Sequence, residues 1–465
     1  MRSIAFASVV ILLALSPLMV QDSFAQSFGF GFDDEGAENV SGSGSFAVSI
    51  GGEAAAAMTG YIGDFEEGAD TVRLGDIFSG RLNFSAGTSF ADGVINLKWQ
   101  TSPQPVSIDE AYVRAYLGNF DITAGLRKLT WGKADSFGPL DVINPLDSSE
   151  IYTVMADQSD LMSVKIARPL VHASFRFGQF SKIEGVFVPW FEPHRFATEG
   201  RWMPAQMKML TNPDIPTPIP IEINITETKP DTAALDYAQA GLRFTSTIGR
   251  ADIGAQYYYG RLPQPAAQIG ITLDLMPPSP SATVNVLFLY NPYHQIGLDY
   301  AQVLAGFNVR AELAANITED LKGDDGSVYN PSIAWSFGFD RDLFLGINLN
   351  LQVNESIRLL HDKLGSDDIA SVMAGGFDIE GGSKLTATRL TAVVSRKFIR
   401  DELELRVGVV WGIEDSDCII MPALVWTKDN IRFALSGGFF AGDSDGQLGQ
   451  YNDNHFLKLS MAYTF

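Results

Sequence analysis

The last ten residues of the chain, FLKLSMAYTF (residues 456–465), decide which fold the sequence favours. In an extended strand successive side chains point to opposite faces, so this segment has one apolar face and one mostly small or polar face. The apolar face carries Leu457, Leu459, Met461, Tyr463 and Phe465. An edge strand of a soluble sheet would have to hide such a face. In a closed barrel the last strand pairs with the first and its apolar face meets lipid, so the segment predicts a transmembrane antiparallel β-barrel.

The N-terminus predicts export. A basic start, an apolar run over residues 4–20 and the small residue Ala25 form the pattern of a secretory signal peptide. No Cys lies directly after the apolar run, and no other stretch approaches about 18 apolar residues, so we expect neither a lipid anchor nor a membrane helix. The expected division of the chain is a signal peptide over 1–25, a flexible acidic leader over 26–42 and one barrel domain over 43–465.

The composition agrees with an all-β chain. It includes 44 Gly, 31 Phe, 14 Tyr and 7 Trp, and its single cysteine, Cys418, excludes a disulfide framework. Long capped helical patterns are hard to find, whereas alternating segments of about nine to twelve residues recur along the chain, as in transmembrane barrels.

Tight turns and longer connections alternate along the chain. About eight turn-forming sites, among them Gly118-Asn119 and residues 340–342, join neighbouring strands. Nine longer connections separate them: 63–76, 102–106, 129–160, 192–234, 261–294, 318–330, 355–384, 413–418 and 442–454. This arrangement predicts about 18 strands (16–18), with short periplasmic turns, long extracellular loops and both termini in the periplasm. Segment 282–290 also has a strand pattern, but counting it as a spanning strand would break the up-and-down alternation of the strands. We therefore place it in a loop hairpin.

We expect no plug domain before the first strand, and therefore a lumen that is open or narrowed by a loop, since a barrel of about 16 to 18 strands holds an aqueous channel. The net charge is −22, yet bases recur on the predicted lumen faces of the strands. The candidates for the lumen wall are Arg81, Arg114, Arg243, Arg310, Arg389 and Arg406. They either form a basic track that favours anions or pair with acids on neighbouring strands and brace the wall.

The most distinctive stretch is GLRKLTWGKADSFGPLDVINPLDSSEIY, residues 125–152. It contains the third long connection, which is much longer than a hairpin requires. We expect it to fold at least partly inward and narrow the lumen, the alternative being a loop that stands out from the surface. The candidate constriction residues are Arg127, Trp131, Lys133, Asp135, Asp141, Asn144 and Asp147.

This stretch carries a resemblance. A strand ending in Gly-x-Arg, then Trp-Gly-Lys, and later Asp-x-x-Asn-Pro-x-Asp resembles a family of uncharacterised Gram-negative outer-membrane barrels, known as a domain of unknown function. It is also loosely similar to alginate-export and other porin-like barrels. The resemblance implies an outer-membrane transport or pore protein, while export of a particular polymer does not transfer to this chain.

The chain lacks the usual signs of an enzyme. Its five histidines have neither nucleophile nor metal-ligand spacing, so we expect no catalytic residues, no metal and no cofactor. The expected function is passage of small or extended solutes by diffusion or facilitated diffusion. One alternative is an adhesin or binding platform built on loops 192–234 and 261–294. The other is a transporter of hydrophobic cargo, suggested by six apolar loop residues: Trp190, Phe191, Trp202, Met203, Met207 and Met209.

The expected location is the bacterial outer membrane, reached by export to the periplasm. The expected partners are outer-membrane lipid and lipopolysaccharide, small solutes, and the outer-membrane barrel-assembly machinery, which would recognise the C-terminal Phe465. No nucleic-acid partner is expected for a chain with so large an excess of acid.

Overall fold

The fold is that of a computed structural model. It describes residues 46–63, 72–73, 78–101, 105–157, 161–211, 220–227, 235–274, 276, 280–363, 373–377, 379 and 384–465. The predicted signal peptide and acidic leader lie outside the described residues. Within the described ranges, no helix is both long and apolar enough to cross a membrane.

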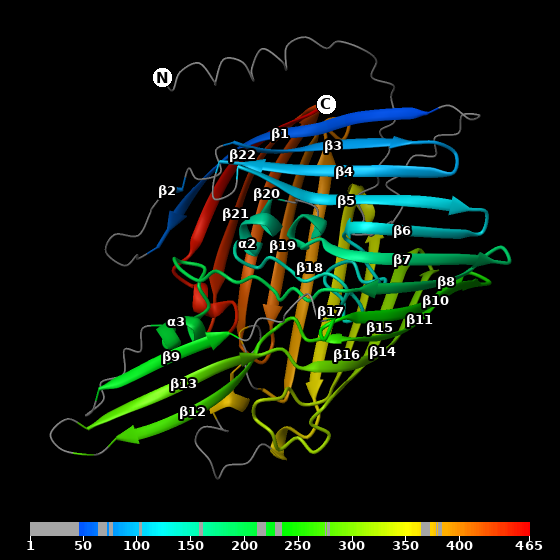
Figure 1. The fold of residues 1–465 in the computed structure, drawn as a ribbon. Coiled ribbons are helices and arrows are strands. Elements are labelled where there is room, and N and C mark those ends of the chain that lie inside the picture. The colour runs from blue at the N-terminus through cyan, green and yellow to red at the C-terminus, as the bar shows by residue number, and fades with distance from the viewer. Residues whose placement is uncertain are drawn as a thin grey trace, which may run out of the picture.

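Eighteen strands form a closed antiparallel barrel (Figure 1), in which each strand pairs with its neighbours in chain order and β22 pairs with β1. This confirms the predicted fold and strand number. The strands are β1 (Ala47–Ile62), β3 (Ser79–Gly87), β4 (Ala91–Gln100), β5 (Val106–Leu117), β6 (Phe120–Arg127), β7 (Arg168–Phe177), β8 (Ser181–Val188), β10 (Gln239–Ile248), β11 (Ala251–Arg261), β14 (Pro292–Leu304), β15 (Phe307–Thr318), β16 (Ser332–Asp342), β17 (Ile347–Arg358), β18 (Thr386–Phe398), β19 (Leu403–Gly412), β20 (Asp417–Lys428), β21 (Ile431–Ala441) and β22 (His455–Thr464). The two-residue strand β2 (Val72–Arg73) adds a short pairing to β1.

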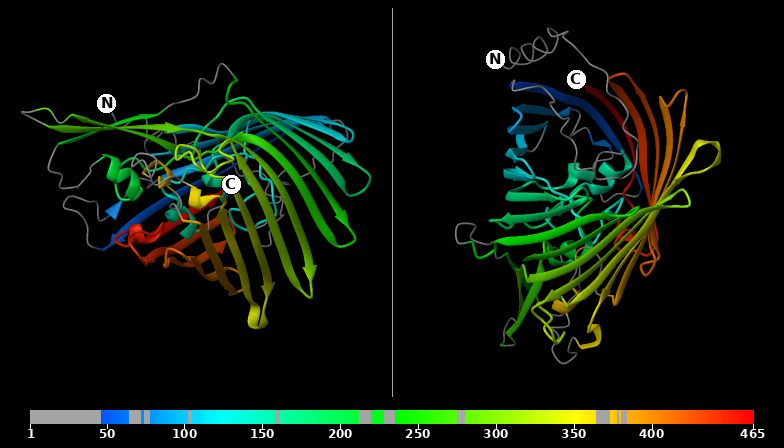
Figure 2. Two further views of the ribbon diagram at one scale, coloured as in Figure 1. Left: turned by 90° about the horizontal axis from the view of Figure 1, so that it is seen from below. Right: turned by 90° about the vertical axis from the view of Figure 1, so that its right-hand side faces the viewer.

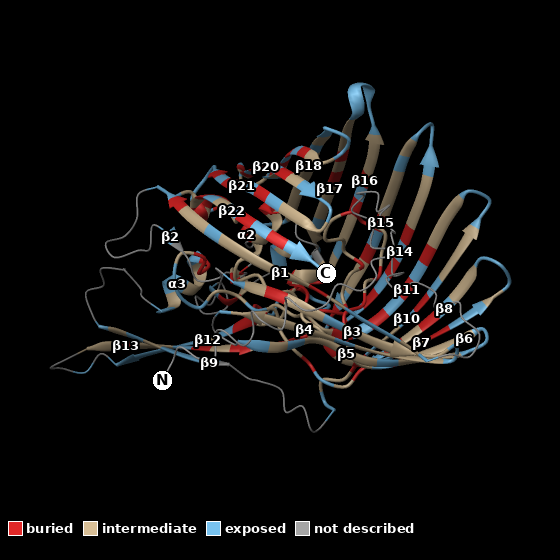
Figure 3. Cartoon of the chain, turned by 90° about the horizontal axis from the view of Figure 1, so that it is seen from above, coloured by how far each residue is buried: buried red, intermediate tan, exposed pale blue. Residues whose placement is uncertain are grey.

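The C-terminal strand behaves as its sequence pattern predicts. Its apolar residues at alternate positions are exposed on the outside of the barrel, whereas Phe456 and Ser460 between them are buried inside, an alternation that recurs along the strands in Figure 3. Phe465 completes the closure, because its backbone N–H and C=O each form a 2.9 Å hydrogen bond with Gly52 of β1. A barrel with an apolar exterior and no free edge is the form in which β-strands cross a bilayer.

The connections differ at the two ends of the barrel (Figures 1 and 2). Eight short turns lie at one end, here called the turn end, and nine mostly longer connections lie at the loop end. β1 begins and β22 ends at the turn end. The turn expected at residues 340–342 is displaced, because β16 continues to Asp342 and the chain reverses over residues 343–346, where Leu345 and Gly346 have positive φ.

A second, small sheet stands at the loop end. It contains β9 (Ile221–Glu227), β12 (Ala266–Asp274) and β13 (Ser281–Leu289), in which β13 is antiparallel to β12 and parallel to β9. This confirms that segment 282–290 belongs to a loop hairpin. The helices are short: α2 (Ile151–Ala156), α3 (Ala205–Thr211), and the 3-10 helices η1 (Leu161–Val164), η2 (Phe344–Gly346), η3 (His361–Lys363) and η4 (Gly449–Tyr451).

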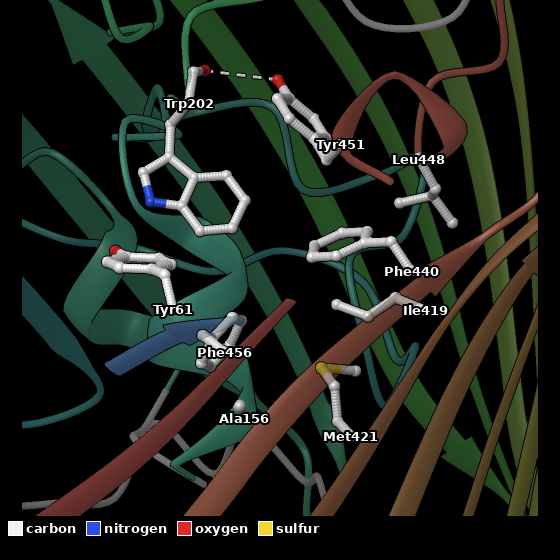
Figure 4. Packing of buried hydrophobic residues seen from close by; sticks show 9 residues of the cluster. All are labelled: Tyr61, Ala156, Trp202, Ile419, Met421, Phe440, Leu448, Tyr451 and Phe456. Carbon is white, nitrogen blue, oxygen red and sulfur yellow. Dashed lines mark hydrogen bonds between the residues drawn. The ribbon is translucent and has the colours of Figure 1, made fainter. Parts of the chain in front are cut away.

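The core of the molecule lies inside the barrel, where the connection from β6 to β7, residues 128–167, enters and carries α2 with it (Figures 1 and 2). We call this connection the lumen loop. Its contacts with β15, β17 and β22 confirm that it folds inward. Figure 4 shows one of the clusters that it joins, in which Ala156 packs with side chains of β20, β21 and β22 and with Trp202, whose carbonyl accepts a 3.3 Å hydrogen bond from the Tyr451 hydroxyl.

Candidate functional site

The strand register places all six predicted wall arginines on the lumen side. Arg81 lies opposite Glu53 and Lys98, for example, and Arg243 lies opposite Glu184 and Gln256. In an antiparallel pair, residues that face each other point to the same side of the sheet. The barrel therefore has an apolar exterior and an interior of polar and charged side chains.

Many of the inward bases form ion pairs. Arg114 lies 3.3 Å from Asp92 on the neighbouring strand, and Arg243 lies 2.7 Å from Asp299. Arg310 contacts two carboxylates, Asp340 at 2.7 Å and Asp135 of the lumen loop at 2.6 Å. These pairs favour the interpretation that the inward arginines brace the wall.

Arg406 and Arg389 have different surroundings. Arg406 donates to the backbone carbonyls of Met155 and Ala156 at 3.3 and 3.4 Å, so it holds the C-terminal end of α2. Cations near a helix C-terminus are favourable because the last carbonyls lack intrahelical partners. Arg389 instead lines the cavity described below.

The base of the lumen loop is closed by polar contacts. The Asn144 side chain accepts from Leu129 N–H at 2.7 Å and donates to the carbonyls of Arg127 and Ile166 at 3.1 and 2.8 Å. Asn144 therefore joins the two ends of the loop. Within the loop, Asp141 forms a 2.6 Å ion pair with the buried Lys165, although burial raises the pKa of the Asp141 carboxyl against the opposing effect of that lysine.

Trp131 packs the loop against the wall. It is 2% exposed and lies in a cluster with Tyr258 and Tyr293. Gly241 of β10 makes room for it, because a Cβ at that position would lie 2.7 Å from the indole ring. Arg127, at the end of β6, contacts the Thr123 hydroxyl at 3.4 Å and lies over the ring of Tyr112.

The tip of the loop is bound to β15 and β17. The Glu312 carboxylate accepts from the backbone N–H groups of Lys133, Ala134 and Leu140. The Asp135 carboxylate binds Arg310 and accepts a 3.0 Å hydrogen bond from Asn350. Asp135 lies on the loop rather than on a strand, and burial raises its pKa to about 6 against the opposing effects of Arg310 and Asn350.

The far end of the loop is fixed to the last strands of the barrel. Asp157, which follows α2, lies 3.1 Å from Lys458 and accepts a 3.0 Å hydrogen bond from Ser460, both on β22. Its backbone carbonyl also accepts from Arg432 on β21. The loop thus crosses the lumen from β6 to β22. Asp147 has a local role, since it accepts from the backbone N–H and the hydroxyl of Ser149.

A cavity of about 580 Å³ remains between the lumen loop and the wall. One side is formed by residues 136–139 of the loop tip, another by Tyr152 and Met155 of α2, and the wall by strands β15 to β19 at their loop ends. Its polar lining is dominated by neutral groups, including the amides Gln264, Asn316, Asn330, Asn354, Gln447 and Gln450. The charged side chains among the described lining residues are Arg358, Lys384, Arg389 and Glu355, and Lys384 forms a 2.7 Å ion pair with Asp415.

Six of the seven residues expected at the constriction lie on the lumen loop, and Arg127 lies at the end of β6. Among the described lining residues, none is Arg127, Trp131, Lys133, Asp135, Asp141, Asn144 or Asp147. Of these residues, Trp131 and Asp135 hold the loop against the wall, and residues 136–139 of the same loop line the cavity. Ser136 and Phe137 line the cavity but were not predicted from the sequence. Both lie within residues 125–152, and neither has the charge or the indole ring on which the prediction was based.

The apolar residues considered for hydrophobic cargo are divided between two environments. Phe191, Trp202 and Met203 are buried among other loop and strand residues, whereas Trp190 and Met209 are exposed at 47% and 61%. Trp202 packs in the cluster of Phe440 and Phe456, whereas Met207 packs against the separate cluster of Phe288 and Phe377.

No protein-family model and no curated protein matches the chain, so the resemblance to a family of uncharacterised barrels has no support of that kind. Among solved structures, the chain is similar to OccK9 (OpdG) from Pseudomonas aeruginosa, with 8% identity and a TM-score of 0.49 over 90% of this chain and 98% of that chain. It is also similar to OmpF from Salmonella typhi, with 9% identity and a TM-score of 0.42 over 90% and 97% of the two chains. A mutant of Rhodopseudomonas blastica porin gives 10% identity and a TM-score of 0.41 over 90% and 100%. At these identities the substrates of the three proteins say nothing about the solutes of this chain.

Proposed function

We propose that the protein is a porin-like, non-enzymatic channel of the bacterial outer membrane, through which small solutes pass by diffusion or facilitated diffusion. The observation that carries this proposal is the cavity between the lumen loop and the wall of a closed barrel. A space lined by both polar and apolar side chains, inside an apolar exterior, offers a solute a route that avoids lipid.

The solutes that best fit this lining are small, polar and uncharged. Amide and hydroxyl groups dominate the polar lining, and they exchange hydrogen bonds with water or with a hydroxylated solute. Arg243 and Arg310 are occupied by carboxylates, so they add little net charge to the passage. Among the described lining residues, Arg358 and Arg389 lie with one acid, Glu355, which favours a modest preference for anions over cations.

The proposal extends to the surroundings of the protein. The exposed apolar side chains would contact outer-membrane lipid, and lipopolysaccharide would surround the loop end. Export by the N-terminal signal and recognition of Phe465 by the barrel-assembly machinery would bring the chain there.

Swelling of liposomes that contain the refolded protein tests this function. Neutral sugars of increasing size are added outside, and the rate of swelling reports their entry. We expect monosaccharides to enter and larger oligosaccharides to be excluded by a cavity of about 580 Å³. Liposomes that contain folded barrel and do not swell in any sugar would contradict the proposal.

A further inference from the structure

The Glu312 carboxylate is enclosed by backbone of the lumen loop. Ala134 N–H donates to Oε1 at 2.7 Å, Leu140 N–H donates to Oε2 at 3.3 Å, and Lys133 N–H also donates to Oε1. Glu312 is 4% exposed. A buried carboxylate that accepts several N–H groups forms strong charge-assisted hydrogen bonds, and it orders the backbone that supplies them.

Two glycines of the loop allow this approach. A Cβ at Gly132 or at Gly138 would lie 3.0 Å from Cδ of Glu312. Gly132 also has a φ of +106°, which L residues with side chains rarely adopt. The loop sequence around these glycines is therefore fitted to a carboxylate that lies on a strand remote in sequence.

The neighbouring wall residues reinforce the contact. Oε1 of Gln352 accepts from the N–H groups of Asp135 and Ser136, both at 3.0 Å. Arg310 and Asn350 bind the Asp135 carboxylate. Glu312 and these three wall residues all lie on β15 or β17. Residues 136–139 of the loop, which lie between the contacts, line the cavity.

Glu312 differs in its partners from Glu184 and Asp299, which form ion pairs with bases of the wall. Among the described residues, no basic side chain forms an ion pair with it. The charged groups that face it are Asp299 opposite on β14, which is paired with Arg243, and Lys133 and Asp135 of the loop. Loop backbone is thus its principal partner, and a neutral amide at this position would present an N–H₂ group to N–H donors.

We infer that Glu312 is a positioning residue that sets the width of the passage, because its carboxylate holds the lumen-loop tip, residues 132–140, against β15. The width matters for solutes only if the protein is a channel, so this part of the inference rests on the proposed function. The position of the tip does not depend on it.

The test compares Glu312→Gln with Glu184→Gln in a Cys418→Ala background. Glu184 is also 4% exposed and also faces the lumen, but its ion-pair partners are Lys182 and His172 on the wall. A nitroxide attached at Phe137→Cys reports the mobility of the tip, and liposome swelling reports the largest sugar that enters. Slower migration after boiling shows that each variant was a folded barrel.

We expect Glu312→Gln to give a mobile nitroxide, entry of larger sugars and a conductance about twofold higher or more, while Glu184→Gln gives none of these changes. A mobile nitroxide in Glu312→Gln supports the inference about the tip even if the wild type admits no sugar. Failure of the wild type to admit any sugar would contradict only the proposed function. An immobile nitroxide and an unchanged size limit in folded Glu312→Gln would overturn the inference, whether or not the wild type conducts.

If Glu312→Gln does not fold, Gly138→Ala provides a second variant. Its added methyl group would displace the tip from the carboxylate while leaving the wall unchanged. The same mobile nitroxide is expected, and an immobile one would again overturn the inference.

Discussion

Asp157 lies 3.1 Å from Nζ of Lys458, which joins the end of α2 to the last strand of the barrel. Since Asp157 follows the inward helix and Lys458 lies on β22, this ion pair fixes the lumen loop on the side of the lumen opposite its tip. The loop is held at the tip by Glu312 and at the far end by Asp157, and the cavity lies between these attachments.

Loss of the Asp157 carboxylate should release α2. Asp157→Ala leaves Lys458, whose side chain is 14% exposed, without this partner, so we expect a loss of about 1–3 kcal/mol in the free energy of unfolding. A nitroxide at Met155→Cys should become mobile at the same time. The measurement is urea unfolding in detergent together with the nitroxide spectrum. As a control, Asp121→Ala removes the pair with Arg176, whose side chain is 53% exposed, and should cost much less.

The packing of Trp131 against Gly241 gives a second prediction. Gly241→Ala places a methyl group 2.7 Å from the indole ring, so Trp131 or the strand must move, at a cost of about 1–3 kcal/mol in unfolding free energy. Gly185→Ala on the adjacent strand meets its nearest neighbour only at 4.0 Å and should be nearly neutral. Equal urea midpoints for the two variants would show that Trp131 is not packed as described.

Charge selectivity should depend on the location of an arginine rather than on its presence in the lumen. Arg389 lines the cavity, so Arg389→Gln should shift the reversal potential in a salt gradient toward cation preference. Arg243 is buried and paired with Asp299, so Arg243→Gln should lower stability and leave the reversal potential almost unchanged. A larger shift from Arg243→Gln than from Arg389→Gln would favour a basic track over bracing.

Acidification should stabilise the contact between the loop tip and the barrel wall, because Asp135 takes up a proton. Burial raises the pKa of Asp135 to about 6, above its ordinary value of 3.8, so the docked loop binds more protons than a released loop between these values. This contribution to docking is therefore complete below about pH 4 and is lost as the pH rises through about 6. The mobility of a nitroxide at Phe137→Cys should fall on acidification, and Asp135→Asn should reduce this pH dependence. An unchanged pH dependence in Asp135→Asn would assign the effect to other groups.

The barrel could be predicted from the sequence because its determinants are local. Alternation with period two and tight turns such as Gly118-Asn119 lie within single hairpins, and together they give the strand number. The turn at residues 343–346 was displaced because the sequence Asp340-Arg341-Asp342 suggests a turn, although these residues continue the pairing of β16 with β17.

The arrangement of the lumen could be predicted only in part. The length and composition of residues 125–152 pointed to an inward loop, but its partners depend on contacts across the closed barrel. Glu312 meets Ala134 at a separation of 178 residues, and no local pattern indicates that Glu312 binds loop backbone while Glu184 and Asp299 bind bases. The constriction residues predicted from their charge or aromatic ring therefore include residues that hold the loop in place. The loop residues that line the cavity include Ser136 and Phe137.

The most direct test of the account is single-channel conductance of the refolded protein with a cysteine at the loop tip. Phe137→Cys in the Cys418→Ala background places a thiol in the cavity lining, and Met276→Cys places one at a residue that follows the end of β12 and is 77% exposed. Both accept a methanethiosulfonate reagent of the same size. We expect stable conductance steps that become smaller when Cys replaces Phe137 and is modified, and that stay the same when the modified site is 276. Silence from folded barrel, or full modification at position 137 with unchanged steps, would contradict the claim that solutes pass between the lumen loop and the wall.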